Sequence, residues 1–316
     1  MILRQYQLDT VNAVLDAFNN GLRSVLAVLP TGSGKTIIAS QICTKYPRVV
    51  WIAHRNELLD QAERALKLVG HNNFTLQSIY AEPKVVDCDL LVLDESHHEP
   101  AITVRRLIDR IKYKHLLGLT ATPYRMDNKI MSFNTVIYGV GLDDLVNDRY
   151  LVPIHLVNVV TRSPHDLIKW MYVHPEYMHK SIIFVKDKSD GRFYTGLLST
   201  DYIVAEIYGE SDRARIIHEY QYGNIDVLVS CVVLTEGTDL PCTNTVVIAR
   251  NTKSKTLLTQ MVGRAMRPYK SKTHCNVIQP ITIDSSSKSV RDIIIPEQHF
   301  VSSYRDGLWV TTKLSA

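Results

Sequence analysis

The sequence lacks any apolar run approaching the roughly 20 residues that a membrane-spanning helix needs. It also lacks a signal-peptide pattern at its N-terminus, so we expect a cytoplasmic protein with no membrane partner. There is no CxxC pair, which argues against a zinc site or a disulfide framework. The cysteines are odd in number and far apart, and we expect buried or idle thiols at Cys43, Cys88, Cys231, Cys242 and Cys275.

Low-complexity tracts and solenoid-type repeats are absent as well. The apolar fraction of 45% and the charged fraction of 22% are ordinary for a globular protein, which excludes disordered and collagenous chains. A length of 316 residues predicts two domains. The net charge of +4 permits a nucleic-acid partner but does not demonstrate one.

Short β-branched runs alternate with helical stretches in the first half of the chain. Runs this apolar, separated by helices, are typical of a parallel sheet covered on both faces. The predicted strands are residues 24–30, 48–54, 89–95 and 115–122, with helices beginning near Lys35 and at residues 55–69.

The same alternation restarts after Leu151. A proline after a short apolar patch places the seam at residues 149–153, so the predicted domains are residues 1–150 and 151–316. Two such series predict an α/β protein with two doubly wound parallel-sheet lobes. The predicted elements of the second lobe are strands at residues 180–186, 201–210, 225–231 and 244–250 and helices at residues 212–223 and 256–266.

The segment LPTGSGKT, residues 29–36, lies between a predicted strand and a predicted helix, which is the setting of a phosphate-binding loop. Gly32 and Gly34 let backbone N–H groups surround a phosphate without interference from a Cβ atom. Lys35 is placed to reach the β and γ phosphates of ATP, and the Thr36 hydroxyl to hold Mg²⁺. Leu29 departs from the general pattern, which has glycine there. The predicted ATP-binding residues of the loop are Thr31, Gly32, Ser33, Gly34, Lys35 and Thr36.

Two carboxylates, Asp94 and Glu95, stand at the end of an apolar strand in LLVLDESHH. In open α/β sheets, ligands bind at this edge. We predict that Asp94 holds Mg²⁺ and that Glu95 acts as the general base that polarises the attacking water.

These motifs, in this order, resemble those of superfamily 2 helicases and translocases of the DExH branch, and most of all DNA repair and restriction-type motors. The match runs from Arg4 to about Pro268. The resemblance implies two tandem RecA-like lobes of the P-loop NTPase fold, ATP and Mg²⁺ as cofactors, and nucleic-acid-stimulated ATP hydrolysis.

The resemblance also assigns residues of the first lobe. In RQYQ, Gln7 would read the adenine edge with Arg4 nearby, and in IAHRNEL, His54 and Arg55 would contact the nucleic-acid backbone. The residues implied in coupling the ATP and nucleic-acid sites are His97, Thr120 and Thr122.

In the second lobe, VLTEGTDLP and QMVGRAMRP resemble motifs that contact both ligands. Thr235 and Glu236 would face the nucleic acid, and Gly237 and Asp239 the nucleotide. Gln260, Arg264 and Arg267 have the spacing of one helix face, which predicts two guanidinium groups that meet phosphate charge.

The resulting hypothesis is an ATP-dependent DNA motor whose nucleotide binds in the cleft between the lobes. The preference for DNA over RNA rests on the resemblance alone. An RNA-dependent ATPase, an ATP-gated nucleic-acid clamp and another P-loop enzyme remain alternatives. A monomer is the default expectation, and so short a motor suits a virus or mobile element.

Overall fold

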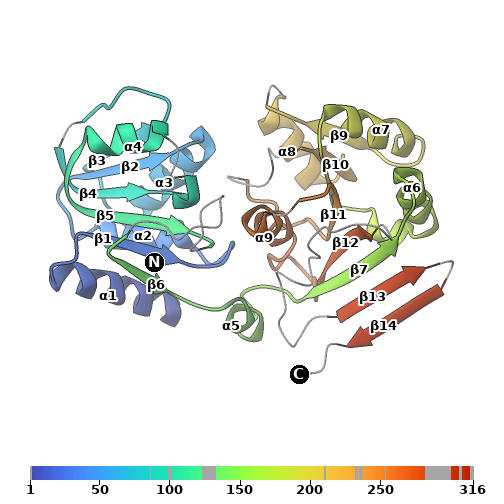
Figure 1. The fold of residues 1–316 in the computed structure, drawn as a ribbon, viewed down its shortest axis with the longest axis horizontal. Coiled ribbons are helices and arrows are strands. Elements are labelled where there is room, and N and C mark those ends of the chain that lie inside the picture. Colours follow the sequence, from blue (N-terminus) through green and yellow to red (C-terminus); the bar gives the residue numbers. More distant parts are fainter. Residues whose placement is uncertain are drawn as a thin grey trace. The chain divides into compact units, whose positions relative to one another are not determined.

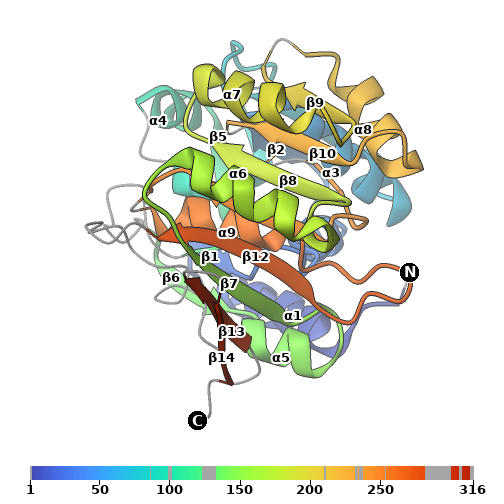
Figure 2. The same ribbon diagram turned by 90° about the vertical axis from the view of Figure 1, so that its right-hand side faces the viewer.

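The computed structural model describes residues 2–85, 87–98, 102–122, 133–209, 211–231, 234, 238–252, 254–281, 300–305 and 308–313. The chain forms two compact units, Met1–Gly141 and Leu142–Ala316 (Figures 1 and 2). Helix α5 (Leu142–Asn147) therefore belongs to unit 2, and the division falls just before the seam expected at residues 149–153. Within these described ranges, no helix is both long and apolar enough to span a bilayer.

Unit 1 is built on a six-stranded sheet in the order β3-β2-β4-β5-β1-β6, and every pairing in it is parallel. Because the strands are parallel, their carboxyl ends share one edge of the sheet. The strands are β1 (Ser24–Val28), β2 (Val49–Ala53), β3 (Phe74–Ser78), β4 (Asp87–Leu93), β5 (Lys112–Thr120) and β6 (Thr135–Tyr138).

Helices cover both faces of this sheet (Figure 1). Alternate strand residues point to opposite faces. Trp51 thus packs in the core beneath α1, α2 and α3, while Ile52 packs with α4 on the other face. The helices are α1 (Gln5–Asn19), α2 (Lys35–Cys43), α3 (Asn56–Leu68) and α4 (Ile102–Asp109), with a short 3₁₀ helix, η1 (Ser96–His98), after β4.

Unit 2 has an eight-stranded sheet in the order β14-β13-β7-β12-β11-β8-β10-β9. Its strands are parallel except β14, which pairs antiparallel with β13 at the edge. The tail therefore completes unit 2, with β12 inside the sheet. The strands are β7 (Ile154–Val160), β8 (Ser181–Val185), β9 (Val204–Ile207), β10 (Val227–Ser230), β11 (Thr245–Ala249), β12 (Cys275–Ile281), β13 (Phe300–Arg305) and β14 (Leu308–Lys313).

One face of the second sheet is covered by α6 and α7, which lie in front of it in Figure 2. Trp170 and Met171 of α6 and Tyr194 and Leu198 of α7 are buried there against the strands. The helices are α6 (Pro164–Val173), α7 (Lys188–Leu198), α8 (Arg213–Tyr222) and α9 (Lys255–Gly263), with a 3₁₀ helix, η2 (Pro175–Tyr177).

The five thiols behave as expected. Cys43, Cys88, Cys242 and Cys275 are buried and Cys231 is half-buried, and all are free. Burial raises the pKa of each, so none is poised as a thiolate.

Candidate nucleotide-binding site

The segment after β1 has the backbone geometry of an anion-binding loop. Gly32 and Gly34 have φ angles of 87° and 84°, in the left-handed region that glycine adopts without strain. Gly34 is also the N-cap of α2, and no side chain caps this helix end. The first amides of α2 and the positive end of its dipole are therefore available to an anion.

The side chain of Lys35 contacts the backbone at the start of the loop. Its Nζ donates to the carbonyl oxygens of Leu29 at 3.3 Å and Pro30 at 3.4 Å. These are long hydrogen bonds to neutral acceptors, so a phosphate oxygen is a stronger partner for this ammonium group.

Side chains of helix α1 form hydrogen bonds with the backbone of the phosphate loop. Gln7 is only 7% exposed, and its Nε2 donates to the Ser33 carbonyl at 3.1 Å while its Oε1 accepts from the Arg4 amide at 3.0 Å. Tyr6 donates its hydroxyl to the same Ser33 carbonyl at 2.6 Å. Gln7 is thus a buried contact of the phosphate loop, whereas the Arg4 side chain is exposed. The motif RQYQ gave no separate signal for the role of Tyr6.

Asp94 follows β4 and is buried, and charged side chains lie near its carboxyl group. Burial raises the pKa of the Asp94 carboxyl, the negative charge of Glu95 raises it further, and the positive charge of Lys35 opposes both effects. A desolvated carboxylate beside a second carboxylate is stabilised as an anion when a cation binds to it. Its environment therefore fits a hard divalent cation.

Glu95 has a φ of 49°, an uncommon conformation for a residue with a Cβ atom. The predicted strand 89–95 ends at Leu93 instead, and the left-handed turn redirects the chain. The Glu95 amide donates to Asp94 Oδ1 at 2.9 Å, and Glu95 Oε2 lies 3.4 Å from Nδ1 of the buried His97. The two carboxyl groups and His97 thus form one cluster at the end of β4.

Thr120 ends β5, the strand between β4 and β1 in the sheet. Its Oγ1 donates to the Thr122 carbonyl at 2.9 Å and accepts from the Thr122 amide at 3.2 Å. Its own carbonyl accepts from the Leu29 amide at 3.0 Å. The turn after β5 is therefore joined by backbone to the start of the phosphate loop.

His54 and Arg55 follow β2 at the same edge, and both are half-buried. Arg55 is the N-cap of α3. The charge of His54 also acts on Asp94 and lowers its pKa. Apart from Arg4 and Gln7 at the start of α1, the predicted residues of unit 1 thus lie along the carboxyl ends of β1, β2, β4 and β5.

In unit 2, the arginine segment is tied to the segment that contains Asp239. Arg264 is buried and its Nη1 donates to the Thr238 carbonyl, and Arg267 Nη1 forms an ion pair with Asp239 Oδ1. Burial lowers the pKa of the Arg267 guanidinium. Gln260 is buried in α9. The predicted Thr235, Glu236 and Gly237 lie outside the described residues.

The prediction of a continuous helix over residues 256–266 is wrong. Helix α9 ends at Gly263, so Arg264 is its C-cap and Arg267 lies beyond it. The amides of Arg264 and Ala265 already bond three residues back, and the Met266 carbonyl accepts from Val152 of another segment. Pro268 disfavours helical geometry at the residue before it. Tertiary contacts rather than one helix face bring these arginines to Thr238 and Asp239.

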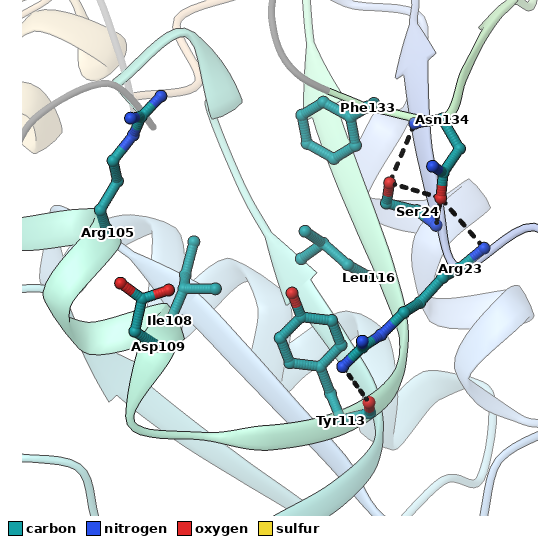
Figure 3. A pocket seen from close by; sticks show the side chains of 9 residues that line it. All are labelled: Arg23, Ser24, Arg105, Ile108, Asp109, Tyr113, Leu116, Phe133 and Asn134. Carbon is teal, nitrogen blue, oxygen red and sulfur yellow. Dashed lines mark hydrogen bonds between the residues drawn. The ribbon is translucent and has the colours of Figure 1, made fainter.

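Unit 1 also has a pocket of about 510 Å³ at the amino ends of β1 and β5, at the sheet edge opposite the phosphate loop (Figure 3). Arg23 extends across the Tyr113 ring, 5.0 Å from its centroid, and the Asn134 side chain accepts from Ser24. Because neither Lys35 nor Asp94 lines it, this pocket provides control positions for tests of the nucleotide site.

Among the residues that the structure describes, no group of three His, Cys, Asp or Glu side chains could hold a metal ion.

Parts of the chain match two models of known protein families. Residues 1–87 and 75–125 match the family model "Type III restriction enzyme, res subunit", and residues 163–269 match "Helicase conserved C-terminal domain". A Saccharomyces cerevisiae protein, "Putative ATP-dependent helicase IRC3", is 25% identical over 90% of this chain. The chain spans 52% of the length of that relative.

Two solved structures share the fold. A fragment of "a putative HsdR subunit of a type I restriction enzyme from Vibrio vulnificus YJ016" superposes with a TM-score of 0.72 at 21% identity, over 98% of this chain and 70% of that one. The "ATP-dependent Type ISP restriction-modification enzyme LlaBIII bound to DNA" gives 0.68 at 15% identity, over 91% and 28%. Both units therefore have the RecA-like fold expected from the sequence.

Proposed function

From the two family models that match the chain and from its helicase relative, we propose that it is a superfamily 2 helicase that hydrolyses ATP and couples hydrolysis to movement on, or remodelling of, DNA. The observation that carries the proposal is the cluster of Lys35, Asp94 and Glu95 at the carboxyl ends of β1 and β4. A phosphate-binding loop alone would suit many nucleotide-binding proteins. A carboxylate in the position of a general base is needed only for hydrolysis.

In unit 1, the amides of residues 31–36 and the Lys35 ammonium bind the ATP phosphates. Thr36 and Asp94 hold Mg²⁺, which neutralises phosphate charge when bound. Glu95 takes a proton from the attacking water, and its contact with His97 orients it. Gln7 and Arg4 are proposed to recognise adenine, with Gln7 also linking base recognition to the loop through Ser33.

In unit 2, Arg264 and Arg267 are proposed to stabilise the charge that develops on the transferred phosphate, with Gln260, Gly237 and Asp239 on the nucleotide side. The present partners of both arginines support this role. The Thr238 carbonyl accepts from Arg264, and the exposed Asp239 carboxylate pairs with Arg267, so both guanidinium groups are held beside a segment on the nucleotide side.

Nucleic acid is proposed to contact His54 and Arg55 in unit 1 and Thr235 and Glu236 in unit 2. Binding is then mainly to phosphates, so it weakens as salt rises and is nearly independent of sequence. His97, Thr120 and Thr122 are proposed to couple this contact to ATP, since Thr120 is bonded to the phosphate-loop segment. DNA is favoured because the family model that matches residues 1–87 and 75–125 is that of a restriction-enzyme subunit. A monomeric state and a cytoplasmic location stay predictions.

The test is steady-state ATP hydrolysis by the wild type alone, with single-stranded, duplex and forked DNA, and with RNA of matched sequence. We expect DNA to stimulate hydrolysis and Lys35→Ala to lower kcat by roughly 100–1,000-fold. Tyr113→Phe, in the pocket at the opposite sheet edge, serves as the control and should leave kcat unchanged. Greater stimulation by RNA than by DNA would show that RNA is the nucleic acid on which the protein acts. ATP binding without hydrolysis under any condition would contradict the proposal.

A further inference from the structure

Lys272 has an unusual set of partners for a lysine. It lies in the turn between α9 and β12, and its Nζ donates to the Thr243 carbonyl at 2.5 Å, to the Ala265 carbonyl, and to the Pro241 carbonyl at 3.5 Å. Among the described residues, no carboxylate is bonded to this ammonium group. Its three N–H groups donate to backbone carbonyls of two different segments.

These two segments are the ones that contain the proposed catalytic groups of unit 2. Pro241 and Thr243 come two and four residues after Asp239, and Ala265 lies between Arg264 and Arg267. One side chain therefore links the backbone on either side of the Arg267–Asp239 ion pair.

The hydrogen bonds of Lys272 differ from those of the two arginines, because they do not have to change during ATP hydrolysis. When Arg264 and Arg267 meet phosphate charge, their guanidinium groups can turn from the Thr238 carbonyl and the Asp239 carboxylate toward phosphate oxygens. Lys272 uses neither arginine side chain nor the Asp239 carboxylate. Its bonds can persist through that change and keep the two segments in register.

We propose that Lys272 is a positioning residue for ATP hydrolysis, whose ammonium group fixes the backbone of the arginine segment against the segment of Asp239. The proposal rests on the proposed function, because it assumes that Arg264 and Arg267 act on the ATP phosphates. Displacing a catalytic group by about 1 Å can cost up to ~100-fold in rate, so a backbone link of this kind is sufficient to control kcat.

The surroundings of Lys272 add a dependence on pH. Burial lowers the pKa of its ammonium group to about 8, and Cys275 and Cys242 are the titratable groups beside it. Lys180 and Lys270 also act on Cys242. The protonated group has three N–H donors and the neutral amine has two, so deprotonation leaves one carbonyl without its donor. The link weakens as pH rises through about 8.

The test compares Lys272→Met with Lys270→Met, which removes an exposed lysine two positions away that stacks on Tyr269. We measure kcat and KM for ATP at saturating DNA, together with thermal unfolding. We expect Lys272→Met to lower kcat by ~10-fold while KM for ATP changes by less than about twofold. Lys270→Met should match the wild type. A folded Lys272→Met protein with wild-type kcat would reduce Lys272 to a structural role and overturn the proposal.

Since Lys272→Met removes a donor from buried carbonyls, it could fail to fold. Lys272→Arg then gives an independent test, because a guanidinium stays protonated across the range. We expect wild-type kcat to fall as pH rises from 7 to 9, and the fall to be absent in Lys272→Arg. The same alkaline fall in both proteins would overturn the proposal. Failure of the proposed function is distinguishable, since the wild type would then show no nucleic-acid-stimulated hydrolysis at any pH.

Discussion

The candidate catalytic residues of the two units are held in place by different means. In unit 1, the phosphate loop and Asp94 lie directly after strands of one parallel sheet. Hydrogen bonds from Gln7 and Tyr6 to the Ser33 carbonyl, and from the Leu29 amide to the Thr120 carbonyl, steady the loop segment. In unit 2, the arginine segment follows a helix that has already ended, and the side chains of Arg264, Arg267 and Lys272 hold it. Backbone geometry positions the first set, and cationic side chains position the second.

This difference predicts how each unit responds to substitution. In unit 1, removing a catalytic group should leave its neighbours in place, because the strands position them. In unit 2, removing one cation should disturb the others, because each contributes to the same junction. The following changes test this contrast, from the largest expected effect to the smallest.

Glu95→Gln should lower kcat for ATP hydrolysis by about 1,000-fold, because a general base typically contributes 10²–10⁴-fold. ATP affinity should stay within a few-fold of the wild type, since the amide has nearly the same shape and the loop is untouched. Single-turnover hydrolysis and binding of a fluorescent ATP analogue measure the two quantities. A variant that hydrolyses ATP at the wild-type rate would exclude Glu95 as the base.

Arg267→Ala should lower kcat by about 100-fold, in the range found when one donor to transition-state charge is removed. It also frees the Asp239 carboxylate, so we expect a lower midpoint of thermal unfolding than for Glu95→Gln. Arg213→Ala, at the start of α8, is the matched control and should keep the wild-type kcat. Equal unfolding midpoints for Arg267→Ala and Glu95→Gln would argue against the contrast between the units.

Gly34→Ala tests the loop geometry directly. Its left-handed φ costs about 1 kcal/mol or more for a residue with a Cβ atom, and the new Cβ would lie 2.7 Å from Gln7 Nε2. Gly21→Ala is the control, because Gly21 has a φ of 86° but no atom within 4 Å of the added Cβ. We expect both variants to lose stability and only Gly34→Ala to bind ATP more weakly. Equal ATP affinity in both would show that the Gln7 contact does not shape the loop.

Substitution of Asp89 is expected to have the smallest effect on the protein, and Asp89 lies outside the candidate catalytic residues of both units. Hydrogen bonds from Arg48 and Lys114 hold the pKa of the Asp89 carboxyl at about 2, below its ordinary value. A lowered folded-state pKa stabilises the protein above the unfolded value near 4, and this contribution is lost as pH falls toward 2. We expect Asp89→Asn to lower the unfolding midpoint by a few degrees at pH 7 and to flatten its dependence between pH 4 and 2. Thermal unfolding at several pH values measures both.

Local patterns in the sequence predicted unit 1 well. The strands around the phosphate loop and Asp94 were confirmed to within a few residues, because short apolar runs and glycine turns are local signals. The left-handed conformation of Glu95 had no such signal. It follows from the turn that joins β4 to η1, where Asp94 and His97 pack around it.

The sequence predicted unit 2 less completely. The spacing of Gln260, Arg264 and Arg267 indicated one helix face, but the Met266 carbonyl is taken by Val152 and the helix ends at Gly263. Lys272 also gave no signal, because its partners are backbone carbonyls far away in sequence. Contacts of that kind depend on the tertiary structure and leave no motif.

The central claim is that residues of both units serve one hydrolysis reaction. The most direct test is kcat at saturating DNA for Glu95→Gln, Arg267→Ala and the double variant. Residues that act as a unit are non-additive, so we predict that the double variant is slower than Glu95→Gln by less than about threefold. A double variant slower by the full product of the two single losses would contradict the claim.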